Sequence, residues 1–168
     1  MRRLVALAAA AALALALAGC GFQLRGTANL PFETIIVPGA GGGIALDLKR
    51  NIQSGTNARV VDDPKTAQAV LQFLEEVRQK EILSLTATGR VREYRLVYRV
   101  GFRVHDGKGR EFVSPNTIRL TRDVTFNDSD ILAKEAEEGL LFRDMQFDMV
   151  QQVMRVLAAA QPPKPLVE

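Results

Sequence analysis

Residues that perform catalysis or hold metals are scarce in this chain of 168 residues, which contains one cysteine, one histidine and no tryptophan. A single cysteine excludes a disulfide within the chain, and one histidine with one thiol cannot assemble a zinc or iron site. Nucleophilic catalysis needs an activatable nucleophile beside a base. The lone His105 closes a predicted strand at a turn, where a solvated side chain is the simpler interpretation. We therefore expect a binding protein with no enzymatic activity, no metal and no cofactor.

Loop composition and charge disfavour two further classes of site. The glycine-rich stretch at 39–43 lacks both the lysine of a P-loop and the spacing of a dinucleotide-binding loop. The chain has 22 Lys and Arg residues against 19 Asp and Glu residues, and the 22 include Arg2 and Arg3 at the N-terminus. Without those two, the excess is a single positive charge, which does not favour a nucleic-acid partner.

The N-terminus has the organisation of a bacterial export signal. Arg2 and Arg3 precede an apolar run at 4–17, which is shorter than the roughly 20 residues that a membrane-spanning helix needs. The run ends in Leu17-Ala18-Gly19-Cys20, which resembles the lipobox of bacterial lipoproteins. We predict that Cys20 is lipidated, with a diacylglycerol on its sulfur, and becomes the acylated N-terminus after cleavage. The alternative is an ordinary secretory signal with Cys20 as a free thiol, but that thiol would have no disulfide partner.

The rest of the chain is predicted to form one domain between two irregular ends. Residues 1–19 are the signal peptide, and residues 20–32 are the acylated N-terminus and a tether. Residues 33–160 have the length of a single domain with one adequate core. Residues 161–168 contain Pro162, Pro163 and Pro165, which cannot continue a helix, so we expect a disordered tail.

Hydrophobic periodicity predicts helices and strands in this domain. Apolar residues repeat at helical spacing at 44–53 and at about 131–159. The clearest strand is 90–104, where the even positions from Tyr94 to Val104 are apolar or aromatic. Further strand-like segments lie at 34–37, 58–61, 70–83 and 111–126. Helices that cover one face of a largely antiparallel sheet give an α+β two-layer sandwich.

Three arginines stand out on the opposite face of the long strand. Arg95, Arg99 and Arg103 share one side because alternate residues of a strand point the same way. Guanidinium forks suit phosphate groups, so this face is a candidate for binding phosphorylated glycolipid. The alternative, which the pattern alone favours, is a solvated face whose arginines pair with the carboxylates of Glu75, Glu76 and Asp123.

Three motifs resemble one family of envelope proteins. The first is Cys-Gly-Phe-Gln-Leu-Arg-Gly at 20–26, directly after the lipobox. The second is Glu93-Tyr94 in the long strand, followed by Arg122-Asp123 ahead of Phe-Asn-Asp at 126–128. The third is Leu-Ala-Lys-Glu at 132–135, at the entry to the last helix. In order and spacing they resemble LptE, the lipopolysaccharide-assembly lipoproteins of Gram-negative outer membranes, across essentially the whole mature chain.

The resemblance implies a two-layer sandwich backed by two helices, and we expect a largely antiparallel or mixed sheet of four strands. It also implies that the protein is a plug inside the β-barrel of LptD and helps lipopolysaccharide reach the cell surface. The expected location is the outer membrane, anchored by acyl chains, on the periplasmic side or within the barrel lumen. The alternative is an envelope lipoprotein that acts as a structural adaptor by binding peptidoglycan or another glycan.

The resemblance also implies lipopolysaccharide binding through basic residues at two places. Lys134 matches the Leu-Ala-Lys motif directly. The expected hairpin tip is Thr86-Ala87-Thr88, so the nearest basic residues there are Arg90 and Arg92. We expect Arg90 and Lys134 to converge at one end of the molecule, because the strand after a hairpin runs back from its predecessor's end.

Overall fold

The computed structural model describes residue 3 and residues 28–39, 42–127 and 130–163, so Cys20 and the predicted signal lie outside the described residues. None of the described helices is long and apolar enough to cross a membrane. The elements follow one another in the order β1 (Thr34–Ile36), α2 (Gly43–Gly55), β2 (Arg59–Val60), β3 (Ala69–Leu85), β4 (Val91–His105), β5 (Glu111–Thr125) and α3 (Ile131–Ala159).

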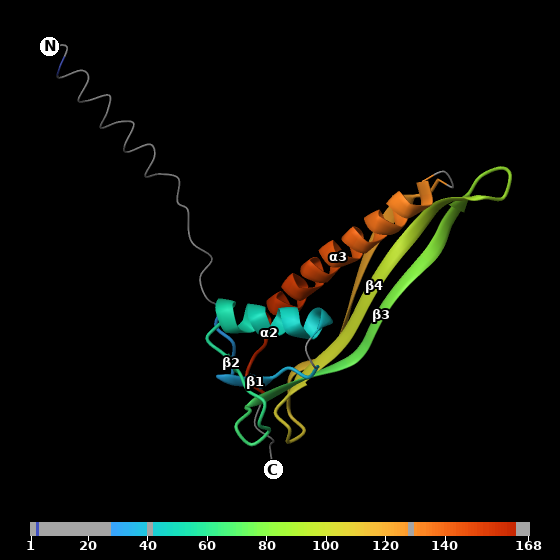
Figure 1. The fold of residues 1–168 in the computed structure, drawn as a ribbon. Helices are drawn as coiled ribbons and strands as arrows, with labels where there is room; N and C mark the ends of the chain where they lie inside the picture. The colour runs from blue at the N-terminus through green and yellow to red at the C-terminus, as the bar shows by residue number, and fades with distance from the viewer. Residues whose placement is uncertain (1–2, 4–27, 40–41, 128–129, 164–168) are drawn as a thin grey trace.

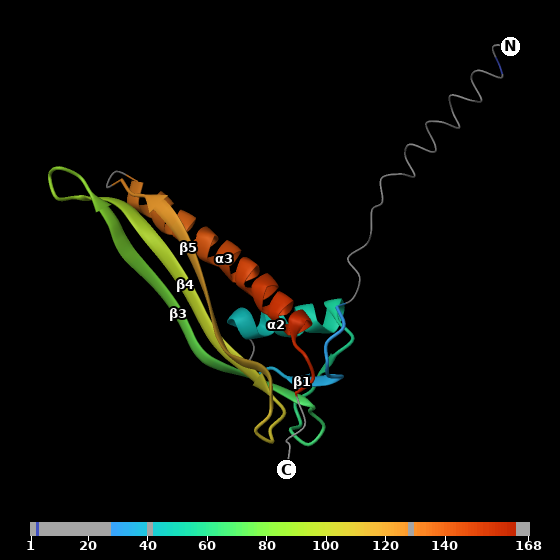
Figure 2. The same cartoon turned by 180° about the vertical axis from the view of Figure 1, so that it is seen from behind.

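The sheet has the strand order β2-β1-β3-β4-β5, and both helices lie on one of its faces (Figures 1 and 2). β3, β4 and β5 are antiparallel, whereas β1 is parallel to both of its neighbours. The predicted α+β sandwich with a mixed sheet is therefore confirmed. The expectation of four strands is wrong by one, because Arg59 and Val60 of β2 pair in parallel with Thr34 and Ile35.

The long strands carry the alternation that the sequence predicts. In β4 every even residue from Leu96 to Val104 is buried beneath the helices, while Arg95, Arg99 and Arg103 occupy the other face. β3 shifts register between Phe73 and Glu75, which is where its own alternation is least regular. β5 continues through Ser114-Pro115-Asn116, and its register against β4 shifts there.

The two helices bury most of the residues that their spacing predicts, and Leu141 and Val156 of the predicted stripe are only partly buried. α2 buries Ile44, Leu48 and Ile52 together with Ala45. α3 buries five residues, all in its second half: Met145, Met149, Val150, Val153 and Leu157. Residues 131–144 of α3 contain no fully buried side chain, and of these residues only Leu141 and Phe142 pack against the core, partly buried.

The molecule accordingly has two regions, which we call the base and the arm. The arm comprises residues 78–98, 120–127 and 131–144; it extends away from α2 and ends at the β3–β4 hairpin (Figure 1). The base is the remainder of the described domain, from residue 28 onward, and it contains most of the hydrophobic core. Six of the eight large hydrophobic residues that are exposed among the described residues lie in the arm: Ile82, Leu83, Leu85, Ile131, Leu132 and Leu140.

Candidate functional site

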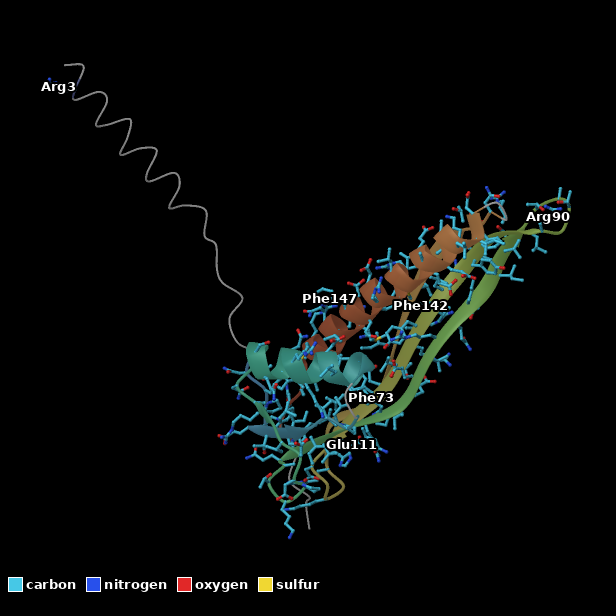
Figure 3. The ribbon with its side chains drawn as sticks, viewed as in Figure 1. Arg3, Phe73, Arg90, Glu111, Phe142 and Phe147 are labelled. Carbon is cyan, nitrogen blue, oxygen red and sulfur yellow. The ribbon has the colours of Figure 1, made fainter. Side chains whose placement is uncertain are left out.

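The far end of the arm is formed by the β3–β4 turn and the beginning of α3. The amide of Gly89 donates to the carbonyl oxygen of Thr86 at 3.0 Å, and Gly89 has the positive φ of 78° that such a turn requires. Arg90 follows directly and lies at this end of the molecule, near the first turns of α3 (Figure 3). The predicted convergence of Arg90 and the Lys134 region at one end therefore holds at the level of the fold.

Lys134 points into the contact between α3 and the sheet rather than toward the hairpin tip. Its side chain is 23% exposed, and its Nζ lies 2.8 Å from Glu137 Oε2. Lys134 lines a small hollow between helix and sheet, and Arg90 is not among the residues around it. The lining residues are Lys80, Tyr94, Leu96, Val124, Phe126, Lys134 and Glu138.

Lys80 is the residue of this hollow that sequence reasoning missed. Its Nζ lies 4.4 Å from the centre of the Tyr94 ring and 2.5 Å from Glu138 Oε2. The Tyr94 ring packs edge-on against Phe126, with the ring centres 5.2 Å apart. Lys80 faces the helix because it lies opposite Leu96 in the pairing of β3 with β4, a register that the structure shows and the sequence pattern does not.

Arg92 lies at the rim of the arm. Its side chain is 65% exposed, and its Nη2 lies 3.8 Å from Glu93 Oε2. Glu93 also accepts a hydrogen bond from the hydroxyl of Ser84. The carbonyl of Arg92 accepts from the amide of Phe126 at 2.8 Å, which ties the end of β5 to β4. Arg92 thus presents its guanidinium to the surroundings from a fixed backbone.

The arginine face of β4 is occupied by partners from the neighbouring strands. Arg95 binds Asp123 through two hydrogen bonds of 2.8 and 3.0 Å. That hydrogen bond lowers the pKa of Asp123 and raises the pKa of Arg95. Arg103 donates to Gln72 Oε1 at 2.8 Å and lies 3.8 Å from Glu111.

Arg99 completes this face, and its carboxylate partner lies over a glycine. Arg99 Nε is 3.1 Å from Glu75 Oε1, a contact within ion-pair distance but outside hydrogen-bond geometry. A Cβ at Gly101 would lie 2.9 Å from Glu75 Cγ, so the glycine leaves room for the Glu75 side chain to lie over this position and reach Arg99. The interpretation of the three arginines as paired residues is thus confirmed for Arg95 with Asp123 and for Arg99 with Glu75.

Polar bridges, rather than apolar contacts alone, join α3 to the outer part of the sheet. Arg78 donates to Gln146, and Arg122 binds Asp148 at 2.8 Å. Arg78 also lies over the Tyr98 ring at 4.8 Å. Burial raises the pKa of Tyr98, whose hydroxyl donates to a glutamate, so this phenol stays protonated.

Other features of the described residues offer no alternative centre. His105 closes β4 as predicted, and its Nδ1 accepts from the amide of Gly107 at 3.0 Å. No group of three His, Cys, Asp or Glu side chains in the described part of the chain could hold a metal ion. An open hollow of about 450 Å³ between α2 and α3 is lined mainly by small and polar side chains, among them Asn51, Gln151 and Arg155.

The fold is that of a class of bacterial lipoproteins with an α+β sandwich. Lipoprotein B from Nitrosomonas europaea, solved by solution NMR, is 47% identical with a TM-score of 0.68; the match covers 80% of this chain and 88% of that one. The crystal structure of the rare lipoprotein B from Shewanella oneidensis is 26% identical with a TM-score of 0.62, over 76% of this chain and 92% of that one.

Within this class the family can be stated. The family model for lipopolysaccharide assembly, LptE, matches residues 26–157, and the chain belongs to that family. The LPS-assembly lipoprotein LptE of Yersinia enterocolitica is 27% identical over 166 residues, which cover 94% of this chain and 77% of that protein. The resemblance drawn from the sequence motifs is therefore confirmed.

Proposed function

We propose that this chain is an outer-membrane lipoprotein that assists lipopolysaccharide transport to the cell surface as the plug and assembly partner of an LptD β-barrel. Its membership of the LptE family supports lipopolysaccharide assembly as the process. The role is one of binding and assembly, with no catalytic step assigned to any residue.

The surface of the arm supports a partner that encloses it. Exposed apolar side chains occur on two separate elements: Ile82 and Leu85 on β3, and Leu132 and Leu140 on α3. β1 pairs with β3 only as far as Val70, so most of β3 presents an open backbone edge. Long open edges invite pairing unless something covers them. A partner that surrounds the arm would cover both the exposed apolar side chains and the open edge of β3. The position of these two features on the arm is the observation that carries the proposal.

Purification from membranes tests the plug role. The lipoprotein should be extracted in detergent as a near-stoichiometric complex with a large β-barrel protein, identified by mass spectrometry. Depletion of the lipoprotein should leave that barrel misassembled, because a bound plug protects the folded form of its partner. Retention on peptidoglycan without any barrel would instead support the structural adaptor and would overturn the proposal.

Lipopolysaccharide binding is assigned to the far end of the arm, through Arg90, Arg92 and Lys134. These residues bring positive charge to one end of the molecule, and lipid A phosphates are dense negative charges that guanidinium and ammonium groups bind. Arg95 and Arg99 lie farther along β4 from the β3–β4 turn, and their guanidinium groups face carboxylates of the neighbouring strands. Binding should weaken as salt rises, since exposed charges are screened beyond about 10 Å at 0.1 M salt.

The double variant Arg90→Asp, Lys134→Asp tests this assignment. It should weaken lipopolysaccharide binding while leaving the fold and the barrel complex intact. Arg103→Gln is a control, because it removes a guanidinium from the other end of β4, in the base. Equal affinities of the double variant and the wild type at low salt would refute the site.

Anchoring is assigned to Cys20. Acyl chains contribute about 0.8 kcal/mol per buried methylene, so two or three of them hold a protein at a membrane without a spanning helix. Cys20→Ser should give a protein that fractionates as soluble or stays uncleaved. Mass spectrometry of the wild-type mature N-terminus provides the decisive measurement, and an unmodified cysteine there would exclude lipid anchoring.

A further inference from the structure

Lys80 lies between two hollows in the arm and lines both of them. The inner hollow, which Lys134 also lines, holds about 10 Å³ and has no room for a phosphoryl group. The outer hollow holds about 360 Å³, opens to the surroundings and is lined by Lys80, Glu135, Glu138, Gly139 and Phe142. Lys80, with a side chain 35% exposed, is therefore the cation that a ligand reaches from this side.

The ammonium group of Lys80 is held in place by its neighbours, and its present contacts leave it unavailable to bind an anion. Tyr94 and Phe126 form an aromatic platform beneath it, with its Nζ 4.4 and 5.9 Å from the two ring centres. Glu138 neutralises it from the helix. With Glu135 and Glu138 both on the outer hollow, the open side carries more negative than positive charge. An anion can bind there only after Glu138 leaves Lys80.

A second cation is within reach of Glu138. Lys134 precedes it by four residues on α3, the spacing at which helical side chains meet, and both residues line the inner hollow. The present partner of Lys134 is the more exposed Glu137. Glu138 can thus exchange Lys80 for Lys134 by a side-chain rotation, without movement of the helix.

We propose that Lys80 is a further phosphate-binding residue of the lipopolysaccharide site, and that it becomes available when Glu138 moves from Lys80 to Lys134. The proposal rests on the proposed function and assigns separate roles within that site. Lys80 contacts the phosphoryl group. Lys134 remains a residue of the site, but its role is refined to that of a positioning residue, which receives Glu138 and does not itself contact the phosphate.

Arg78 provides a matched control on the same strand. It lies two residues before Lys80, faces the same helix and covers a tyrosine ring in the same way, at 4.8 Å from Tyr98. Its helix partner is the neutral Gln146 rather than a glutamate. Neither of the two hollows is lined by Arg78.

The test measures binding of fluorescently labelled lipopolysaccharide to the purified lipoprotein in neutral detergent, with chemically dephosphorylated lipopolysaccharide as the second probe. Lys80→Met should lower affinity about tenfold, the size expected when one charge-assisted hydrogen bond is lost. Glu138→Gln should raise it about threefold by freeing Lys80, and Arg78→Met should change it less than about twofold. Circular dichroism and thermal unfolding verify that each variant is folded.

A double-mutant cycle separates the role of Lys134 from that of Lys80. Lys134→Met should lower affinity in the wild-type background but have no effect in Glu138→Gln, because no carboxylate then needs a new partner. Loss of affinity in both backgrounds would mean that Lys134 contacts the phosphate itself and would overturn the exchange.

Failure of this inference and failure of the proposed function give different results. If the wild type binds both probes equally, phosphate recognition is absent and the proposed site fails with it. If the wild type prefers the phosphorylated probe and Lys80→Met behaves like Arg78→Met, only the role of Lys80 is overturned.

Discussion

The base and the arm share the same sheet, yet they attach α3 to it by different means. In the base, Met145, Met149 and Val153 are buried against the strands. In the arm, residues 131–144 of α3 bury no side chain fully, and Lys80 with Glu138 joins helix to sheet. Apolar burial is strongly stabilising, whereas partly exposed ion pairs contribute about 0–1 kcal/mol each. The base therefore contributes most of the stability that holds α3 to the sheet, and the arm holds the helix more weakly.

The largest expected effect is in the base. Met149→Ala removes a fully buried side chain and should lower the free energy of unfolding by about 2–5 kcal/mol. Leu140→Ala in the arm, where the residue is 54% exposed, should change it by less than about 0.5 kcal/mol. Urea unfolding of both variants measures the difference. Similar losses for the two would mean that the arm has a core of its own.

The next effect lies near the junction of the two regions, at Gly101. The added Cβ of Gly101→Ala would displace Glu75 and separate it from Arg99. Overpacking of this kind costs about 1–3 kcal/mol, and we expect a loss in that range by urea unfolding. Glu75→Ala removes the obstructing side chain, so Gly101→Ala should cost less in that background. Strictly additive costs would show that Glu75 is not the cause.

A glycine in the arm should behave in the opposite way. Gly139 lies within α3, and a Cβ there would meet no atom within 4 Å. Gly139→Ala should therefore stabilise the helix by about 0.5–1 kcal/mol. Hydrogen exchange is the measurement, because the arm should open separately from the base. We expect slower exchange at 131–144 and little change at 145–157; equal slowing of both segments would contradict independent opening.

The smallest effect concerns pH and compares one carboxylate from each region. Arg110 lowers the pKa of Asp106 in the base to about 2, and Arg95 lowers the pKa of Asp123 in the arm. A pKa below that of the unfolded chain, near 3.9, means that each contribution is present above pH 4 and lost as pH falls toward 2. Asp106→Asn and Asp123→Asn should each flatten the fall in stability over that range. If the free energy of unfolding of either variant falls between pH 4 and pH 2 as it does in the wild type, the ion pair of that aspartate is refuted.

Much of the fold was predictable because it rests on local patterns. Alternation in β4 identified the buried face, and the spacing of Ile44, Leu48 and Ile52 identified the core side of α2. The pairing of Arg95 with Asp123 was predictable as one of several options, since the carboxylates that could take part were few. The segment at 58–61 was recognised as strand-like, but its two paired residues carry too little periodicity to show that they join the sheet beside β1, so the expected sheet had four strands instead of five.

The sequence by itself determined the class of elements, the buried faces and the family, because hydrophobic periodicity and short motifs are properties of neighbouring residues. Only the tertiary structure decided the site. Lys80 and Lys134 are 54 positions apart, and they line one hollow only because the register of β3 on β4 and the path of α3 bring them together. Lys134 was predicted as a lipopolysaccharide-binding cation at one end of the molecule; packing turns it toward the sheet, 23% exposed and lining the same hollow as Glu138. Long-range packing of this kind leaves no periodic trace in the chain, so the partner of each charge could be found only in three dimensions.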